Sequence, residues 1–440
     1  MQMIKLSVIA LAVAAASTQM AVASQQSESN GFIEDSKLDA HARVLYMNRD
    51  FRNEDKAQQS YREEAGLGLK AIYESGFTQG TVGFGVDAFG LQGIKLDSGK
   101  GRHSNTMFPT DGRSGKAQDN YSQAGAAVKA RISNTTLKYG QQFVDLPVLS
   151  TDDSRLLPES TTGFLVTSNE IENLELHVGH FTALSAMNQT YRDSVIDDDF
   201  GSLRSLDLVG GRYNFTDNLS AAYYYSDAEI GNKSNDFSAD IKKHYTNVNY
   251  TLPLADTQSI NFDFNMYNSK YDMKHNASGT KDDTKNNIWS LAAAYSFLDA
   301  HTLTFAHQRS TGGSGYVYGY DGGNAIYLAN SVQYQDFDQK GEKSFQARYD
   351  IDLATYGVPG LSFMTRYVRG TNIANTVDGV ERNNGKNWER NIEAKYVLQS
   401  GVAKDLSFRV RQATYRANDA ANVRDNNEVR LIVEYPLSIL

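Results

Sequence analysis

The chain has 440 residues, no cysteine and a formal net charge of −9 at pH 7. The absence of cysteine excludes a disulfide framework, thiolate metal sites and a cysteine nucleophile, and the acidic balance argues against a nucleic-acid partner. With 26 Tyr, 20 Phe and 35 Gly but only 6 Pro, the composition suits a strand-rich protein. Beyond the N-terminal region no stretch approaches the ~18 consecutive apolar residues of a spanning helix, so a polytopic helical membrane protein is excluded.

The first predicted element is a secretory signal peptide, residues 1–23. It has Lys5 near its start, an apolar run over residues 6–16 and the motif Ala21-Val22-Ala23, which is typical of a cleavage site. The alternative, an uncleaved membrane anchor, needs a longer apolar run. We therefore expect a mature chain, residues 24–440, that forms a single domain. Export of a chain without cysteine indicates a bacterial envelope protein.

After this leader, apolar and polar residues alternate at period 2 in segments of about ten residues, as in barrel strands. For example, Ile260, Phe262 and Phe264 alternate with Asn261 and Asp263. About 18 such segments follow one another. They begin near Leu38, Ala65, Gly80, Asn120, Thr135, Gly163, Leu174, Ser205, Asn218, Lys242, Ser259, Asn286, Thr302, Glu342, Gly360, Lys386, Asp405 and Asn427.

The connections between these segments are alternately short and long. The long polar ones are residues 92–119, 144–160, 182–204 and 310–341. An even strand number with short turns on one side and long loops on the other is the plan of an outer-membrane barrel. We therefore predict an all-β fold: a transmembrane antiparallel β-barrel of about 18 strands with short periplasmic turns and long outer loops. A soluble β-sandwich or propeller also alternates, but it buries its apolar face against a second sheet.

Four stretches resemble the OprD family of outer-membrane porins: residues 73–103, 146–163, 320–337 and 430–437. The resemblance spans essentially the whole mature chain. It implies a substrate-selective, 18-stranded channel through which small carboxylate-bearing molecules diffuse, and it implies that the third and seventh outer loops fold inward as constriction loops. The chain departs from the usual barrel ending, because its last residue is Leu440 rather than Phe or Trp.

Basic residues on the polar parity predict a ladder along the pore. If the apolar parity faces lipid, the ladder consists of Arg131, Arg348, Arg366, Arg409, Arg411, Arg430 and Lys129. Arg43 on the first strand has the same parity. Arginine holds a carboxylate through two parallel hydrogen bonds, and several weak sites in series pass an ion along without trapping it. The alternative is that these arginines only pair with inward acids, such as Glu393 and Glu428, and stiffen the wall.

Residues 144–160 are predicted to form the constriction. Asp152, Asp153 and Glu159 bring negative charge to this loop, and Arg155 brings positive charge. The inward glycines Gly83 and Gly85 leave the wall thin, as expected where another segment packs closely. The alternative is a solvated surface loop beside glycines that merely bend a strand.

A second inward loop and an acidic wall complete the predicted pore. In the loop of residues 312–341, Tyr318, Tyr320 and Asp321 are expected to line the mouth, unless this is an ordinary flexible loop. On the opposite wall, Asp207 and Asp263 are predicted to face inward. The arginines of one wall and the acids of the other would set up an electric field across the pore, and this field would orient a zwitterion.

The sequence shows no catalytic constellation, no metal site and no cofactor motif. The eight histidines are scattered, and His177 and His180 lie on opposite faces of one strand. We therefore expect a selective porin of the bacterial outer membrane rather than an enzyme. Its expected partners are small carboxylate solutes, outer-membrane lipid and lipopolysaccharide, and it is expected to be a monomer or a weak trimer. The alternatives are a general diffusion porin and, less in keeping with the ladder, a barrel enzyme or an adhesin.

Overall fold

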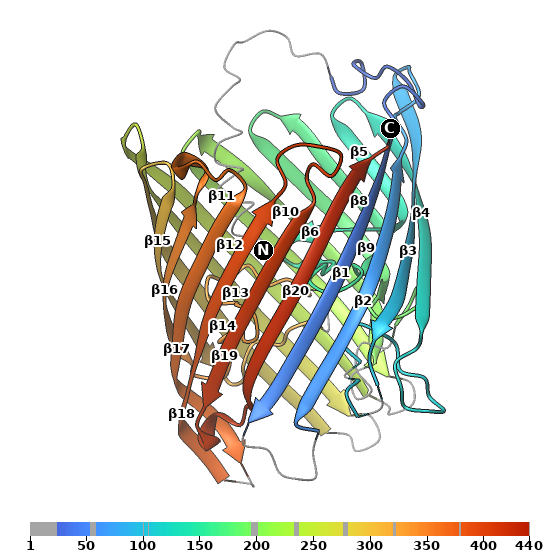
Figure 1. Ribbon diagram of the computed structural model, residues 1–440. Helices are drawn as coiled ribbons and strands as arrows, with labels where there is room; N and C mark the ends of the chain where they lie inside the picture. Colours follow the sequence, from blue (N-terminus) through green and yellow to red (C-terminus); the bar gives the residue numbers. More distant parts are fainter. Residues whose placement is uncertain are drawn as a thin grey trace.

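The computed structural model describes residues 24–52, 59–99, 101–103, 105–194, 201–232, 237–275, 280–319, 323–377 and 380–439. They form a closed antiparallel sheet of 18 strands (Figure 1) and a separate two-stranded hairpin. The predicted all-β barrel and its strand number are therefore confirmed. The predicted signal peptide, residues 1–23, lies outside the described residues.

Each barrel strand pairs with the next, and β20 pairs with β1, where Ala42 lies opposite Tyr435. Figure 1 shows this closure, with blue β1 between β2 and red β20. The strands are β1 (Lys37–Arg52), β2 (Tyr61–Glu74), β3 (Val82–Asp97), β4 (Asn120–Ile132), β5 (Thr135–Gln142), β8 (Ser160–Ile171), β9 (Leu174–Ser185), β10 (Ser202–Thr216), β11 (Leu219–Asn232), β12 (Phe237–Ala255), β13 (Gln258–His275), β14 (Thr280–Phe297), β15 (His301–Gly312), β16 (Lys343–Asp352), β17 (Leu361–Val377), β18 (Val380–Val397), β19 (Ser407–Ala417) and β20 (Asp425–Ser438).

Helical structure among the described residues consists of two single turns, η1 (Ala354–Tyr356) and η2 (Asp419–Ala421). No helix in this part of the chain is long and apolar enough to cross a membrane.

The alternating pattern places polar side chains inside the barrel and apolar side chains outside. On β19, for example, Arg409 is buried, whereas its neighbours Phe408 and Val410 are 44 and 49% exposed. The period of two in a strand turns successive side chains to opposite faces. A barrel surrounded by lipid needs no second sheet against which to bury its apolar face.

Two long outer loops fold into the lumen. Loop L3, residues 143–159 between β5 and β8, contains the short strands β6 (Asp145–Leu146) and β7 (Leu149–Ser150), and loop L7, residues 313–342, joins β15 to β16. Apolar side chains of both loops pack against the inner face of β9–β14; among them, Leu149 of L3 and Leu328 of L7 share one cluster with Tyr267 of β13. A parallel bridge between Ser150 and Gly323 joins the two loops.

Candidate pore constriction

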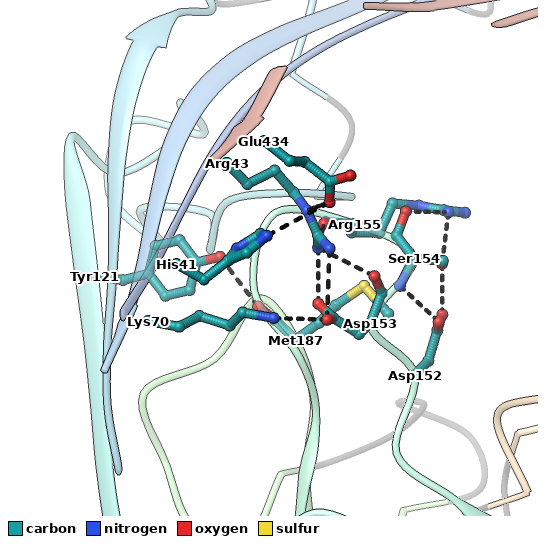
Figure 2. A network of polar contacts seen from close by, with 10 residues as sticks. All are labelled: His41, Arg43, Lys70, Tyr121, Asp152, Asp153, Ser154, Arg155, Met187 and Glu434. Atoms are coloured by element: carbon teal, nitrogen blue, oxygen red, sulfur yellow. Dashed lines mark hydrogen bonds and ion pairs between the residues drawn. The ribbon is translucent and has the colours of Figure 1, made fainter. Parts of the chain in front are cut away.

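An ionic contact fixes L3 to the wall of β1 and β2 (Figure 2). The Asp153 carboxylate lies 2.7 Å from Nη1 of Arg43 and 2.7 Å from Nζ of Lys70. Arg43 also donates to the backbone carbonyl of Arg155 at 2.6 Å and to the Glu434 carboxylate at 2.9 Å. Burial acts to raise the pKa of Asp153, but Arg43 and Lys70 outweigh it and lower that pKa. The contact is therefore a charged one at neutral pH.

Two glycines of β2 create the space in which L3 packs. A Cβ added at Gly68 would lie 2.5 Å from the backbone oxygen of Leu156, and one added at Gly66 would lie 2.5 Å from the Phe108 ring. Phe108 is fully buried and belongs to loop L2, residues 98–119, between β3 and β4. L2 therefore packs against L3, a contact that the sequence alone does not predict.

The predicted glycines, Gly83 and Gly85, face inward but pack against different partners. A Cβ at Gly83 would lie 2.3 Å from the side chain of Gln26, and one at Gly85 would lie 2.7 Å from the backbone oxygen of Gly76. The chain before β1 and the β2–β3 turn occupy this space, so the predicted close packing against these glycines is present, but its partner is not L3. The wall is thin at both glycine pairs, and their spacing does not reveal which loop fills which gap.

Arg155 carries a positive charge of L3 close to charged residues of β1 and β20. Its side chain is half-buried, and burial, with Arg430 and Arg49 nearby, lowers its pKa to about 10, against the opposing effect of Glu428. Arg155 thus remains charged at neutral pH in a region crowded with cations. Arg49, which contacts Glu428, is not among the predicted ladder residues, although it shares the inward parity of Arg43 on β1.

Five members of the predicted ladder lie together on β16, β17, β19 and β20. Arg348 is directly opposite Arg366, and Arg411 is directly opposite Arg430; Arg409 is two residues from Arg411. Like charges directly opposite each other destabilise a sheet unless counter-charges are present. The structure therefore brings these predicted residues onto one wall.

Acids of the same wall balance part of this charge, as the alternative interpretation expected. The shortest ion-pair distances are 2.6 Å from Arg348 to Asp350, 3.0 Å from Arg411 to Glu393 and 2.5 Å from Arg430 to Glu428, and Arg409 lies 3.7 Å from Glu393. Arg366 differs, because its Nε donates to the neutral Asn391 Oδ1 at 2.7 Å and it forms no ion pair within the described ranges. Arg366 therefore carries a guanidinium charge that no wall acid contacts.

Lys129 and Arg131 face inward but lie away from this wall, on β4. The Lys129 ammonium is 2.6 Å from Asp87, and Arg131 donates to Gln26 at 3.0 Å with its guanidinium 4.0 Å from the centre of the Phe77 ring. Gln26 and Phe77 belong to the chain before β1 and to the β2–β3 turn. These two cations hold local segments in place. The prediction that they belong to the ladder was therefore wrong.

The predicted acidic wall is reduced to one residue. Asp263 faces inward and accepts hydrogen bonds from Asn247 and Asn249 at 2.9 and 3.0 Å. Asp207 lies on the outer face instead, because its neighbours Leu206 and Leu208 are the buried residues that join the inner cluster with L3 and L7. The prediction for Asp207 was wrong because the inner face of β10 is apolar where it supports these loops.

L7 contributes polar contacts to the same constriction. Asn324 donates to Glu159 of L3 at 2.5 Å, and the Tyr318 hydroxyl donates to the Asn324 carbonyl at 2.5 Å. Burial, followed by the nearby Asp152, raises the pKa of Glu159 to about 8. The predicted Tyr320 and Asp321 lie outside the described residues. Asp152 makes its contacts within L3, where Ser154 donates to it.

A closed barrel with an outward apolar surface and charged loops folded into its lumen defines a pore-forming protein of the outer membrane. The family model described as "outer membrane porin, OprD family" matches residues 30–439. The chain therefore belongs to the OprD family of substrate-specific porins, whose members are channels of the Gram-negative outer membrane. This confirms the resemblance, the predicted location and the predicted class of function.

Known relatives agree over the full length. The chain is 48% identical to Porin D of Pseudomonas aeruginosa, covering 100% of both chains. Among solved structures, Acinetobacter baumannii OccAB1 is 35% identical with a TM-score of 0.84, covering 95% of this chain and 100% of that one. Pseudomonas aeruginosa OprD is 44% identical with a TM-score of 0.74, covering 96% and 100%.

Proposed function

We propose that this porin admits small carboxylate-bearing solutes, such as amino acids and aromatic or sugar acids, along the wall of β16–β20 and past Arg155. The proposal rests on the surroundings of Arg366. Its guanidinium lies opposite that of Arg348 and is contacted by a neutral amide rather than an acid. A solute carboxylate would supply the missing counter-charge, with the two parallel hydrogen bonds that arginine favours.

The neighbouring cations support movement along the wall rather than tight capture. Arg366, Arg411 and Arg430 lie on β17, β19 and β20, and neighbouring strands are only about 4.8 Å apart. Because Glu393 and Glu428 already contact two of these residues, an arriving carboxylate competes with a resident acid at each step. Such competition keeps each site weak, which conduction requires.

A general diffusion porin is the second candidate function. It is disfavoured because L3 places Arg155 close to Arg430 and Arg49, whereas an unselective pore has no need of cations crowded on one side. Enzymatic or adhesive roles have no site in the described residues that favours them.

The proposal can be tested by uptake into proteoliposomes of paired solutes, each a carboxylate and its primary amide of the same size. Arg366→Gln is expected to slow carboxylate uptake several-fold per folded barrel and to leave amide uptake unchanged. Arg369→Gln, three residues along the same strand on the outer face, is the matched control and should change neither rate. Equal rates for carboxylate and amide in the wild-type protein would refute carboxylate selectivity.

We also propose that the leader is removed after Ala23 and that the barrel is a monomer or a weak trimer. Intact mass measurement of the protein extracted from outer membranes would give a mature chain beginning at Ser24, and native mass spectrometry would give the subunit number. A mass that retains residues 1–23 would contradict the first proposal.

A further inference from the structure

The outer face of the barrel carries four cations on four neighbouring strands: Arg309 of β15, Lys343 of β16, Arg369 of β17 and Arg390 of β18. Their outward direction follows from the side chains next to them, since Gln308, Ser344, Val368 and Glu389 are fully buried on the inner face. The three arginines are exposed and Lys343 is half-buried. We call these four residues the cation row.

The cation row runs nearly parallel to the membrane. Barrel strands are tilted by about 40° from the membrane normal. Residues at equal depth in the membrane on neighbouring strands are therefore displaced by roughly one residue from the hydrogen-bonded pairing. Arg309 is opposite Lys343. Lys343 pairs with Thr371 of β17, which lies two residues from Arg369. Thr371 in turn pairs with Lys386 of β18, which lies four residues from Arg390. Both displacements point toward the periplasmic end and match the lean of the strands in Figure 1.

The row lies at the outer edge of the apolar surface. On its periplasmic side, Phe305, Phe345, Tyr367 and Ile392 follow on the same strands and are 64, 62, 43 and 46% exposed. Both tryptophans of the chain also adjoin it, since Trp289 is opposite Arg309 and Trp388 is opposite Arg369. Tryptophan concentrates at membrane–water interfaces, so the four cations lie at the depth of the lipid head groups.

The cations of this row differ from the outward lysines of β12 and β13 in having no acidic partner. Within the ranges that the structure describes, none of the four forms an ion pair. On β12 and β13, by contrast, Lys242 lies 3.3 Å from Asp227 and Lys270 lies 2.7 Å from Asp272. The chain as a whole is acidic, with a net charge of −9, so a run of four unbalanced cations does not follow from composition.

We propose that the cation row binds the phosphate groups of the outer-leaflet lipid, a phosphorylated glycolipid, whose acyl chains lie on the aromatic surface below. Guanidinium groups bind phosphate oxygens through two hydrogen bonds, and a row that spans four strands matches a head group that carries more than one phosphate. The site is separate from the pore and does not depend on which solute the pore admits.

The two tryptophans allow a direct test, because lipid that settles on the row changes their fluorescence. Purified protein in detergent is titrated with lipopolysaccharide and, separately, with the same material after chemical dephosphorylation. Each cation near an anionic lipid surface strengthens binding about fivefold. Replacing all four residues of the row by Gln should therefore weaken binding of the phosphorylated form at least tenfold and leave binding of the dephosphorylated form unchanged.

A control variant removes the same number of outward charges at paired positions. Lys242, Lys270, Lys274 and Arg52 each form an ion pair with an acid, and their joint replacement by Gln should change the affinity less than twofold. Retained heat-modifiability and conductance would show that both variants fold. Three results would overturn the proposal: equal affinity of the row variant and the wild type, an equal loss in the control, or wild-type binding that ignores phosphorylation. Competition by millimolar inorganic phosphate alone would point to a free-anion site and would also overturn it.

Discussion

Replacing Asp153 by Asn should loosen the constriction, because Asp153 is the carboxylate that holds L3 to the barrel wall. The change leaves Lys70 without its carboxylate at 2.7 Å, while Arg43 keeps Glu434 and two loop carbonyls. Breaking a fully buried pair costs about 3–5 kcal/mol. Since the Asp153 side chain is 34% exposed, water screens part of this, and we expect a loss of about 2 kcal/mol.

A loss of about 2 kcal/mol raises the ratio of detached to attached L3 roughly 30-fold. Single-channel recordings in planar bilayers should show this as a higher frequency of larger, short-lived conductance levels. Asp152→Asn is the matched control, because the Asp152 side chain accepts hydrogen bonds only from Ser154 of the same loop in the described structure. Unchanged records for Asp153→Asn, or equal changes in both variants, would refute the role assigned to this contact.

The pH dependence of the contact follows from the lowered pKa of Asp153. A carboxylate with a depressed pKa contributes stability that is present above its ordinary value of 3.8 and is lost only as pH falls through the lower value. The wild-type records should therefore show no change from this group between about pH 5 and pH 8.

Three further outcomes can be measured on the same preparations. Glu159 has a pKa raised from 4.5 to about 8, so its contribution to stability should fall as pH rises through that interval and then level off; hydrogen exchange of L3 should report this, and Glu159→Gln should abolish it. Gly68→Ala should displace L3 and raise conductance, whereas Gly90→Ala, where a Cβ meets nothing within 4 Å, should not. Replacing Arg409 and Arg411 together by Ala should slow carboxylate uptake tenfold or more per folded barrel, with the Lys pair intermediate; normal uptake would remove both residues from the solute path.

The sequence predicts most about the strands whose two faces differ in polarity. On β17 and β19 Arg366, Arg409 and Arg411 lie on the polar parity and face the lumen, so these three residues could be placed from alternation alone. Period-2 alternation fixes which face a residue occupies. The alternation also predicts the number of strands, because turn and loop residues separate the alternating segments at regular intervals.

Alternation fails where the barrel has an apolar interior. Leu206 and Leu208 turn inward to hold the long loops, so on β10 hydrophobicity no longer marks the lipid face, and Asp207 was assigned to the wrong side. The sequence likewise could not show that Phe108 of L2 is buried against L3, since contacts between loops depend on the closed barrel. A residue that faces the lumen, such as Lys129 of β4, can still lie far from the arginine wall of β16–β20.

The parallel bridge between Ser150 and Gly323 makes L3 and L7 one mechanical unit, reinforced by the hydrogen bond from Asn324 to Glu159. Their apolar residues also rest on a shared cluster, so neither loop can shift without disturbing the other. Evolution within such a barrel is therefore constrained to change the two loops in concert. An engineer who grafts L3 from another porin to alter what this channel admits should transplant L7 with it, because a lone graft would meet a partner shaped for the original loop.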